Sequence, residues 1–255
     1  MSGPVRLEWA HGDAVARVIL ARPRANVMDS AMIDAIRSTV AEIGTRPDLK
    51  LIVFEGEGPN FSFGAAVAEH LPGEVDRMLP KFHALFFELE ELGVPTAAAV
   101  RGHCLGGAAE LVTVCGFVAA APGAHIGFPE VTLGVFPPVA AVALRWRTGG
   151  AVATRMVVTG DPVSAELAAR HGLVDEIADD PRDAVDRWYS AHLGGLSAVG
   201  LRYAWRASRA PFLSALRHEL PKLESLYLDD LMRCADPVEG LRAFMEKRQP
   251  EWRHA

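Results

Sequence analysis

Two glutamates, Glu110 and Glu130, are the only charged residues between Gly102 and Leu144. Most other residues of this stretch are Gly, Ala, Val, Leu, Phe or Pro. An ionised carboxylate that leaves water without a partner costs several kcal/mol, and carboxylates in such surroundings are enriched at functional sites. The pair is therefore a candidate for acid and base chemistry. The alternative is that one or both end at a solvent-facing helix tip or cap a helix.

The position of Glu110 after two glycines favours the chemical interpretation. We expect Gly106-Gly107 to open a helix, so that Glu110 follows Gly107 by one helical turn. At that spacing its carboxylate lies over the same end of the helix as the glycines. A tight turn would explain the glycines but not the acid three residues later.

Composition excludes several classes of protein. Of 255 residues, 50% are hydrophobic and 23% charged, which is enough to bury a sizeable core. The net charge of −6 does not favour binding to a nucleic acid, which calls for a basic surface. The cysteines form an odd set of 3 without CxxC spacing, so we expect neither a disulfide framework nor a metal site.

We expect a cytoplasmic protein that does not span a membrane. The apolar run around Glu110 is long enough for a transmembrane helix. Glu110 in its middle, its glycines and the closing Pro122 argue against one. Glu8 and Asp13 interrupt any apolar region that a signal peptide would need.

The pattern of turns and apolar runs predicts a layered α/β fold with parallel strands. We place the active core in residues 1–190 and a helical region, expected to be used for oligomerisation, in residues 191–255. The predicted strands are 5–9, 14–20, 49–55, 96–101, 117–121, 125–128 and 173–177. The predicted helices start near 29, 106, 138, 161 and 181, with a mixed helical region before 92.

Several motifs stand in an order that is typical of one superfamily. They are Arg22-Pro23 with Asn26, Phe61-Ser62-Phe63-Gly64-Ala65, Val100 to Leu111 around Gly106-Gly107 and Glu110, Gly127 to Gly134 around Pro129-Glu130, Thr159-Gly160-Asp161 with Ser164-Ala165, and Glu239-Gly240 with Ala243 to Arg248. On these residues the chain resembles the enoyl-CoA hydratase/isomerase (crotonase) superfamily over nearly its whole length.

The resemblance implies a spiral of ββα repeats that forms two roughly perpendicular sheets. It also implies a C-terminal helical part used in trimer contacts, with trimers that often pair into hexamers. The implied substrate is an acyl-CoA thioester, which brings coenzyme A with it. No metal or redox cofactor is implied.

The resemblance also assigns roles to site residues. The backbone N–H groups of Ala65 and Gly107 would stabilise the negative charge that develops on the thioester oxygen. Glu110 would activate a water for attack at the β carbon. Glu130 would supply a proton to the α carbon or to its vinylogous equivalent. Because family members that only shift a double bond commonly work with one acid, retention of both favours hydration.

Contacts to coenzyme A are expected from the same comparison. Arg22, Arg24 and Lys247 are candidates for the phosphates, with Lys247 reaching the ligand of a neighbouring subunit. Each is otherwise an ordinary surface charge. The loop that contains Phe63 would lie against the adenine.

The sequence departs from common hydratases at the turn after Gly134. Phe136 and the double proline that follows it indicate a stiffer pocket, in which Phe128 and Phe136 would contact the acyl group. With Glu69-His70-Leu71-Pro72, this makes the chain most similar to hydratases that act on cyclohexa-1,5-diene-1-carbonyl-CoA in anaerobic aromatic degradation. The alternative is that these phenylalanines are plain core residues.

The preferred interpretation is therefore a lyase that adds water to an unsaturated acyl-CoA, with a cyclic dienoyl-CoA as its substrate. A general short-chain enoyl-CoA hydratase, an enoyl-CoA isomerase and a CoA-thioester hydrolase are the alternatives among enzymes. A crotonase-fold protein that has lost catalysis and serves as a scaffold is the alternative outside them, because one fold hosts many functions.

Overall fold

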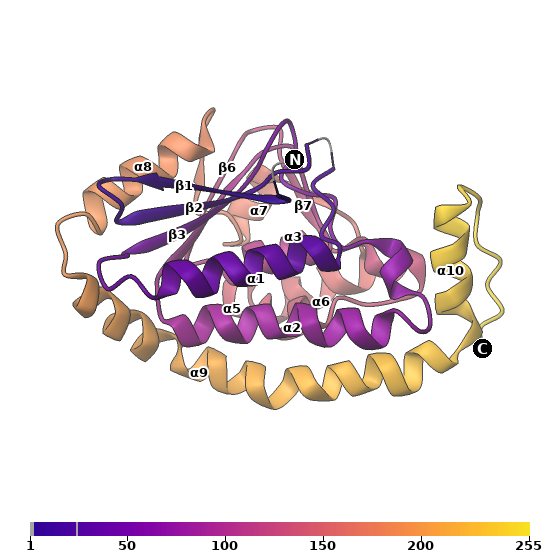
Figure 1. The fold of residues 1–255 in the computed structure, drawn as a ribbon. Helices are drawn as coiled ribbons and strands as arrows, with labels where there is room; N and C mark the ends of the chain where they lie inside the picture. Colours follow the sequence, from indigo (N-terminus) through magenta and orange to yellow (C-terminus); the bar gives the residue numbers. More distant parts are fainter. Residues whose placement is uncertain (1–2, 24) are drawn as a thin grey trace.

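The computed structural model describes residues 3–23 and 25–255. Its main sheet is flanked by helices, and the C-terminal helices extend along one side of the molecule (Figure 1). The strands of this sheet lie in the order β1-β2-β3-β4-β6-β9. The antiparallel pair β1 and β2 begins it, and all later neighbours are parallel. The strands are β1 (Val5–Ala10), β2 (Val15–Leu20), β3 (Leu51–Gly56), β4 (Thr96–Val100), β6 (Phe117–Ala120) and β9 (Glu176–Ile177).

A second, smaller sheet has the order β5-β7-β8. Its strands are β5 (His103–Leu105), β7 (His125–Gly127) and β8 (Val163–Ser164). The chain passes from β4 of the main sheet directly into β5 of the small one, and then into helix α3 (Gly107–Thr113). This passage places the start of α3, with Glu110, at the carboxyl end of a small-sheet strand.

Both faces of the main sheet are covered, because successive side chains of a strand point to opposite faces. Val18, Ile52 and Phe54 face the large core cluster, whereas Leu51 and Val53 face a smaller cluster under helix α8 (Pro181–His192). The large cluster also takes in buried side chains of helices α1 (Ser30–Gly44), α2 (Val75–Leu92) and α9 (Ala198–Ser225). Figure 1 shows α1, α2 and α9 stacked below the sheet.

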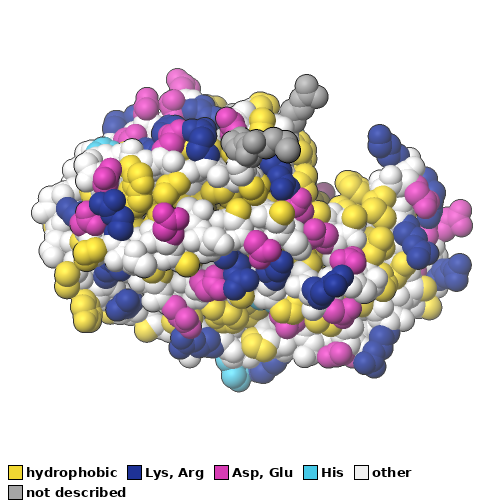
Figure 2. Space-filling model, viewed as in Figure 1, with side chains coloured by type: hydrophobic (Ala, Val, Ile, Leu, Met, Phe, Trp, Pro, Cys, Tyr) yellow, Lys and Arg dark blue, Asp and Glu magenta, His cyan; other side chains and the backbone are white. Residues whose placement is uncertain are grey.

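The remaining helical segments connect these layers and complete the C-terminal part. They are η1 (Val67–His70), η2 (Pro129–Leu133), α4 (Pro138–Ala143), α5 (Arg145–Thr148), α6 (Gly150–Thr159), α7 (Ala165–Arg170), η3 (Leu226–Asp230), η4 (Leu231–Arg233) and α10 (Ala235–Met245). Figure 2 shows a hollow between this C-terminal part and the rest of the molecule, with hydrophobic side chains on its C-terminal side.

Most predicted elements are confirmed, and two boundaries are corrected. The helix expected from Asp161 begins only at Ala165, because Ser164 is its N-cap and accepts a hydrogen bond from the N–H of Leu167. The strand expected over 173–177 is limited to β9, since only its last two residues pair with β6. No helix in the described part of the chain has both the length and the apolar character to cross a membrane.

Candidate active site

Two glycine-containing loops lie against each other at the entrance of α3. A Cβ atom at Gly64 would lie 2.6 Å from the carbonyl oxygen of Leu105 and 3.4 Å from the Cα of Gly106. Gly64 and Gly106 also have φ values of 91° and 55°, which side chains other than glycine rarely adopt. The close approach of the two loops therefore requires glycine at both positions.

This contact brings two backbone N–H groups to one place. A Cβ at Gly107 would lie 3.6 Å from the Cβ of Ala65. Met28 forms a parallel β-bridge with Ala65. The N–H of Met28 donates to the carbonyl oxygen of Gly64, and the carbonyl oxygen of Met28 accepts from the N–H of Ala66. This pattern leaves the N–H of Ala65 without a backbone acceptor among the described residues. The N–H of Gly107 belongs to the first turn of α3, which has no acceptor within the helix.

Glu110 is buried, with 2% of its surface exposed, and is held by the start of another helix. Its Oε1 accepts a hydrogen bond of 2.8 Å from the N–H of Ala140 in α4. Burial raises the pKa of Glu110 from 4.5 to about 7, while hydrogen bonds from the N–H groups of Ala140 and Val139 oppose the rise. The motif Pro137-Pro138 thus starts a helix whose first free donors stabilise the carboxylate of Glu110.

Glu130 lies in η2 and has a less favourable environment for a charge. Its Oε2 is buried and finds no hydrogen-bond partner in the described structure. Burial, and secondly the charge of Glu110, raise the pKa of Glu130 well above 4.5. The two acids therefore differ in their surroundings: burial raises the pKa of both, and the N–H groups of α4 oppose the rise at Glu110. A base and an acid at one site are what a reaction with a proton taken and a proton given requires.

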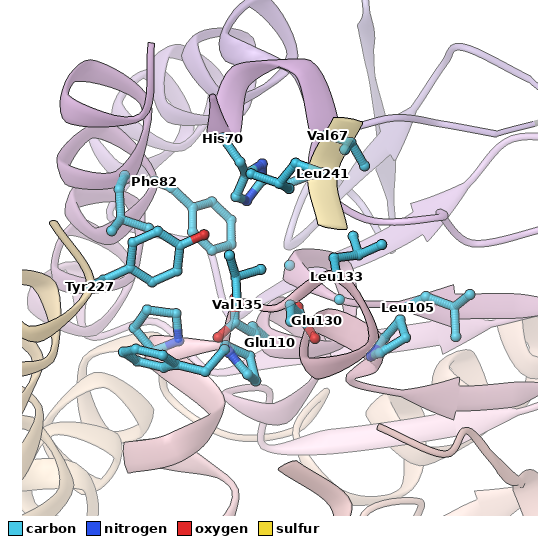
Figure 3. A pocket seen from close by; sticks show the side chains of 18 of the residues that line it. Val67, His70, Phe82, Leu105, Glu110, Glu130, Leu133, Val135, Tyr227 and Leu241 are labelled. Carbon is cyan, nitrogen blue, oxygen red and sulfur yellow. The ribbon is translucent and has the colours of Figure 1, made fainter. Parts of the chain in front are cut away.

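Both acids line a cavity of about 320 Å³ whose other walls are mostly apolar. Figure 3 shows the carboxylates together at one end of this cavity, with aromatic and aliphatic side chains around the remainder. A concave, largely apolar site with a few convergent polar groups is typical of small-molecule binding. The apolar walls include Val67, Met78, Leu79, Phe82, Leu105, Leu133, Val135, Phe136, Leu241 and Phe244.

The structure brings together most of the residues that the sequence predicted for the acyl group. Ala65, Gly107 and both glutamates line the cavity, as do Phe63 and Phe136. Phe128 does not line it: the side chain is fully buried in the large core cluster. The expected contact of Phe128 with the acyl group is therefore corrected to a packing role, because this ring turns into the core just before Pro129 turns the chain into η2.

Two of the cations expected to contact coenzyme A, Arg22 and Lys247, lie outside the cavity that holds the acids. The guanidinium of Arg22 is paired with the carboxylate of Asp29, the N-cap of α1. Lys247 follows the end of α10 and is exposed. Neither residue lines the cavity. Arg24 lies outside the described residues. Phe63 is 45% exposed and packs against the ring of His103, with centroids 5.1 Å apart, at the mouth of the site.

Two polar residues of the cavity were not predicted from the sequence. Tyr227 comes from η3 and His70 from η1, far from the glutamates in sequence. The segment Glu69-His70-Leu71-Pro72 indicates a resemblance and no role for the histidine. Tyr227 stands in a helical region without any motif, so only the packing of the C-terminal part over the core could reveal it.

The fold and the paired acids define a member of the enoyl-CoA hydratase/isomerase family. The model of that family matches residues 10–255 of this chain. The chain therefore belongs to the enoyl-CoA hydratase/isomerase family, and it is an enzyme with the hydratase activity of that family.

Named relatives and solved structures agree with this membership. The cyclohexa-1,5-dienecarbonyl-CoA hydratase of Thauera aromatica is 41% identical over 251 residues, covering 98% of this chain and 97% of the relative. The rat enoyl-CoA hydratase domain-containing protein 3, mitochondrial, is 29% identical, covering 95% and 82% respectively.

A solved enoyl-CoA hydratase from Mycobacterium avium aligns with a TM-score of 0.84 at 26% identity, covering 99% of this chain and all of that one. A second, from Mycobacterium avium subsp. paratuberculosis, has a TM-score of 0.86 at 23% identity, covers 99% of both chains and supports the fold alone. The predicted crotonase-like α/β fold is confirmed.

Proposed function

We propose that this enzyme adds water to a cyclic dienoyl-CoA thioester, cyclohexa-1,5-diene-1-carbonyl-CoA. The observation that carries the proposal is the pair of buried carboxylates without a cation, at one end of an apolar cavity. The choice of a cyclic diene is supported by the relative from Thauera aromatica, whose name gives that substrate. Phe136 and the two prolines after it line the same cavity and suit a flat ring.

The first step would place the thioester oxygen between the N–H groups of Ala65 and Gly107. These donors are pre-oriented by the loop contact at Gly64 and by the first turn of α3. Each such donor is commonly worth a few kcal/mol in the transition state. Because Gly107 opens the helix, the positive end of its dipole also favours the negative oxygen.

Proton transfer would then follow the protonation states of the two acids. Glu110, ionised near neutral pH, takes a proton from water while the hydroxide adds to the β carbon. The electron pair of the double bond moves through the ring to the thioester oxygen and forms a dienolate. Glu130, still protonated, gives its proton to the vinylogous carbon as the electrons return. A proton passed from Glu110 to Glu130 restores the starting state.

Contacts to the rest of coenzyme A and the assembly of subunits belong to the same proposal. Phe63, Arg22 and Lys247 would contact coenzyme A at the mouth of the cavity, and Arg24 is a further candidate. We also propose that residues 191–255 join subunits into a trimer, or a pair of trimers, in the cytoplasm. Exposed hydrophobic side chains of the C-terminal part support such contacts; they include Leu226, Phe244, Met245 and Trp252.

Steady-state rates of water addition test the proposal. The purified protein is offered cyclohexa-1,5-diene-1-carbonyl-CoA and crotonyl-CoA, with Glu110→Gln and Glu130→Gln as controls. We expect a strong preference for the cyclic diene and loss of activity in both variants. Preference for crotonyl-CoA would make the enzyme a general short-chain hydratase. Activity on neither compound would contradict the proposal that the enzyme hydrates these substrates.

A further inference from the structure

Tyr227 presents an unpaired hydroxyl group to the acyl cavity. Its side chain is 1% exposed, and its hydroxyl has no hydrogen-bond partner among the described residues. The ring packs against Phe136 with centroids 5.2 Å apart, and Figure 3 shows the oxygen pointing into the cavity. A buried tyrosine hydroxyl usually finds a partner. Here the partner must come from whatever fills the cavity.

Tyr227 is held by an unusual piece of backbone. It lies in the π-helical turn η3, where the long helix α9 ends and the chain turns toward α10. Such turns are rare and occur frequently at functional sites. Both glutamates contribute to a raised pKa of Tyr227, after burial, so the phenol lies within their electrostatic field. Tyr227 therefore keeps its proton and acts as a donor.

His70 supplies a complementary acceptor in the same cavity. Its Nδ1 lies 3.0 Å from the carbonyl oxygen of Ala66. Because a carbonyl only accepts, Nδ1 carries the proton. Burial lowers the pKa of His70, so the ring is neutral and Nε2 has a free lone pair. Among the described residues Nε2 has no hydrogen-bond partner.

A donor and an acceptor on the wall of one apolar cavity do not match a hydrocarbon ring. An unsubstituted ring would leave both groups without a hydrogen-bond partner, which costs binding free energy. A hydroxyl group of the ring placed between them would satisfy both, since a hydroxyl accepts one hydrogen bond and donates another. Hydration adds one hydroxyl to the substrate, and it does so inside this cavity.

We propose that Tyr227 and His70 form a subsite for the hydroxyl group of a hydroxylated cyclic acyl-CoA. This inference rests on the proposed function and deepens it: the two residues determine specificity for the water and for the hydroxylated product. Tyr227 donates to the oxygen that adds to the ring, and Nε2 of His70 receives its proton in a hydrogen bond. No covalent bond to either residue is involved.

Calorimetric titration with two saturated ring compounds tests the subsite. The ligands are 2-hydroxycyclohexane-1-carbonyl-CoA and cyclohexane-1-carbonyl-CoA, which differ only in the hydroxyl group. All proteins carry Glu130→Gln, which mimics the protonated acid and prevents turnover. We expect Tyr227→Phe to weaken binding of the hydroxylated ligand about tenfold, as one lost hydrogen bond predicts, and to leave the other ligand unchanged.

A matched control is Tyr189→Phe, which removes the hydroxyl of another buried tyrosine, on α8 and outside the cavity. It should change neither Kd. His70→Phe should weaken the hydroxylated ligand as Tyr227→Phe does. If Tyr227→Phe keeps the wild-type preference for the hydroxylated ligand, the subsite is refuted while the proposed function stands. If the parent protein binds neither ring compound, the proposed substrate class itself is refuted.

Discussion

Glu90 and Glu110 are both buried carboxylates, 5% and 2% exposed, but their surroundings differ. Glu90 on α2 is paired with Arg209 of α9, whose Nε donates to its Oε2 at 3.1 Å. Glu110 has only backbone donors, and no cation pairs with it or with Glu130 among the described residues. Burial raises the pKa of Glu90 too, but Arg209 opposes the rise.

On the proposed function, the difference separates a structural carboxylate from a catalytic one. A paired buried acid joins two helices, and its removal leaves a buried cation behind. An acid without a cation contributes no such link and destabilises the protein when it ionises. A fold retains such a group when the group does something else. The predictions below test this separation, from the largest expected effect to the smallest.

Glu110→Gln and Glu130→Gln, made separately, should each lower kcat about 10³-fold, because each removes a proton-transfer group. Neither should lower the free energy of unfolding, since a neutral amide replaces an acid without a cation. Hydration rates and urea unfolding of the same preparations measure both quantities. A variant that keeps wild-type kcat would remove that residue from the chemistry.

Glu90→Gln should have the opposite profile. The guanidinium of Arg209 loses its carboxylate while it stays largely buried, which should cost about 3 kcal/mol of the free energy of unfolding. The value of kcat/KM should remain that of the wild type, because Glu90 does not line the acyl cavity. Urea unfolding at neutral pH measures the loss. Unchanged stability would mean that the pair is not a structural link.

The free energy of unfolding should fall as the pH rises from 4.5 to about 7, the range over which burial shifts the pKa of Glu110. The native protein holds that proton more tightly than the unfolded chain does, so the stabilisation by protonated Glu110 is complete at low pH. The contribution is lost as the pH passes the native pKa, and the total is about 3 kcal/mol. In Glu110→Gln the curve of unfolding free energy against pH should be shallower. Identical curves would contradict the raised pKa.

Glu91→Gln provides the smallest effect and the matched control for Glu90. Glu91 is the next residue of α2 and also pairs with an arginine of α9, Arg217, at 2.7 Å. Both of these side chains are more than half exposed, so solvent screens the pair. The free energy of unfolding should change by about 0–1 kcal/mol. A loss as large as that of Glu90→Gln would show that burial is not what distinguishes the two pairs.

Local patterns in the sequence were sufficient for most of the fold. The hairpin of β1 and β2, the helix capped by Asp29 and the opening of α3 at Gly107 are confirmed. Each depends on residues close together in the chain, such as a capping side chain or an alternation of apolar residues. The short strand β9 was overestimated, because pairing with β6 decides where it begins.

The candidate site could be predicted only in part. Glu110, Glu130 and the two loops carry motifs, and they meet in the cavity. Phe128 and Phe136 have the same residue type and similar neighbours, yet one faces the core and the other the cavity. Which side a ring takes depends on the turns around it, and composition does not contain that information.

By itself, the sequence determined which acids are present, their spacing from the glycines and the family to which the chain belongs. Only the tertiary structure decided how the surroundings of the two acids differ, because α4 gives its N–H donors to Glu110, whereas Oε2 of Glu130 has no hydrogen-bond partner among the described residues. It also decided that Tyr227 reaches the cavity from η3. The physical reason is the same: protonation and hydrogen bonding depend on distances between groups that folding brings together from remote parts of the chain.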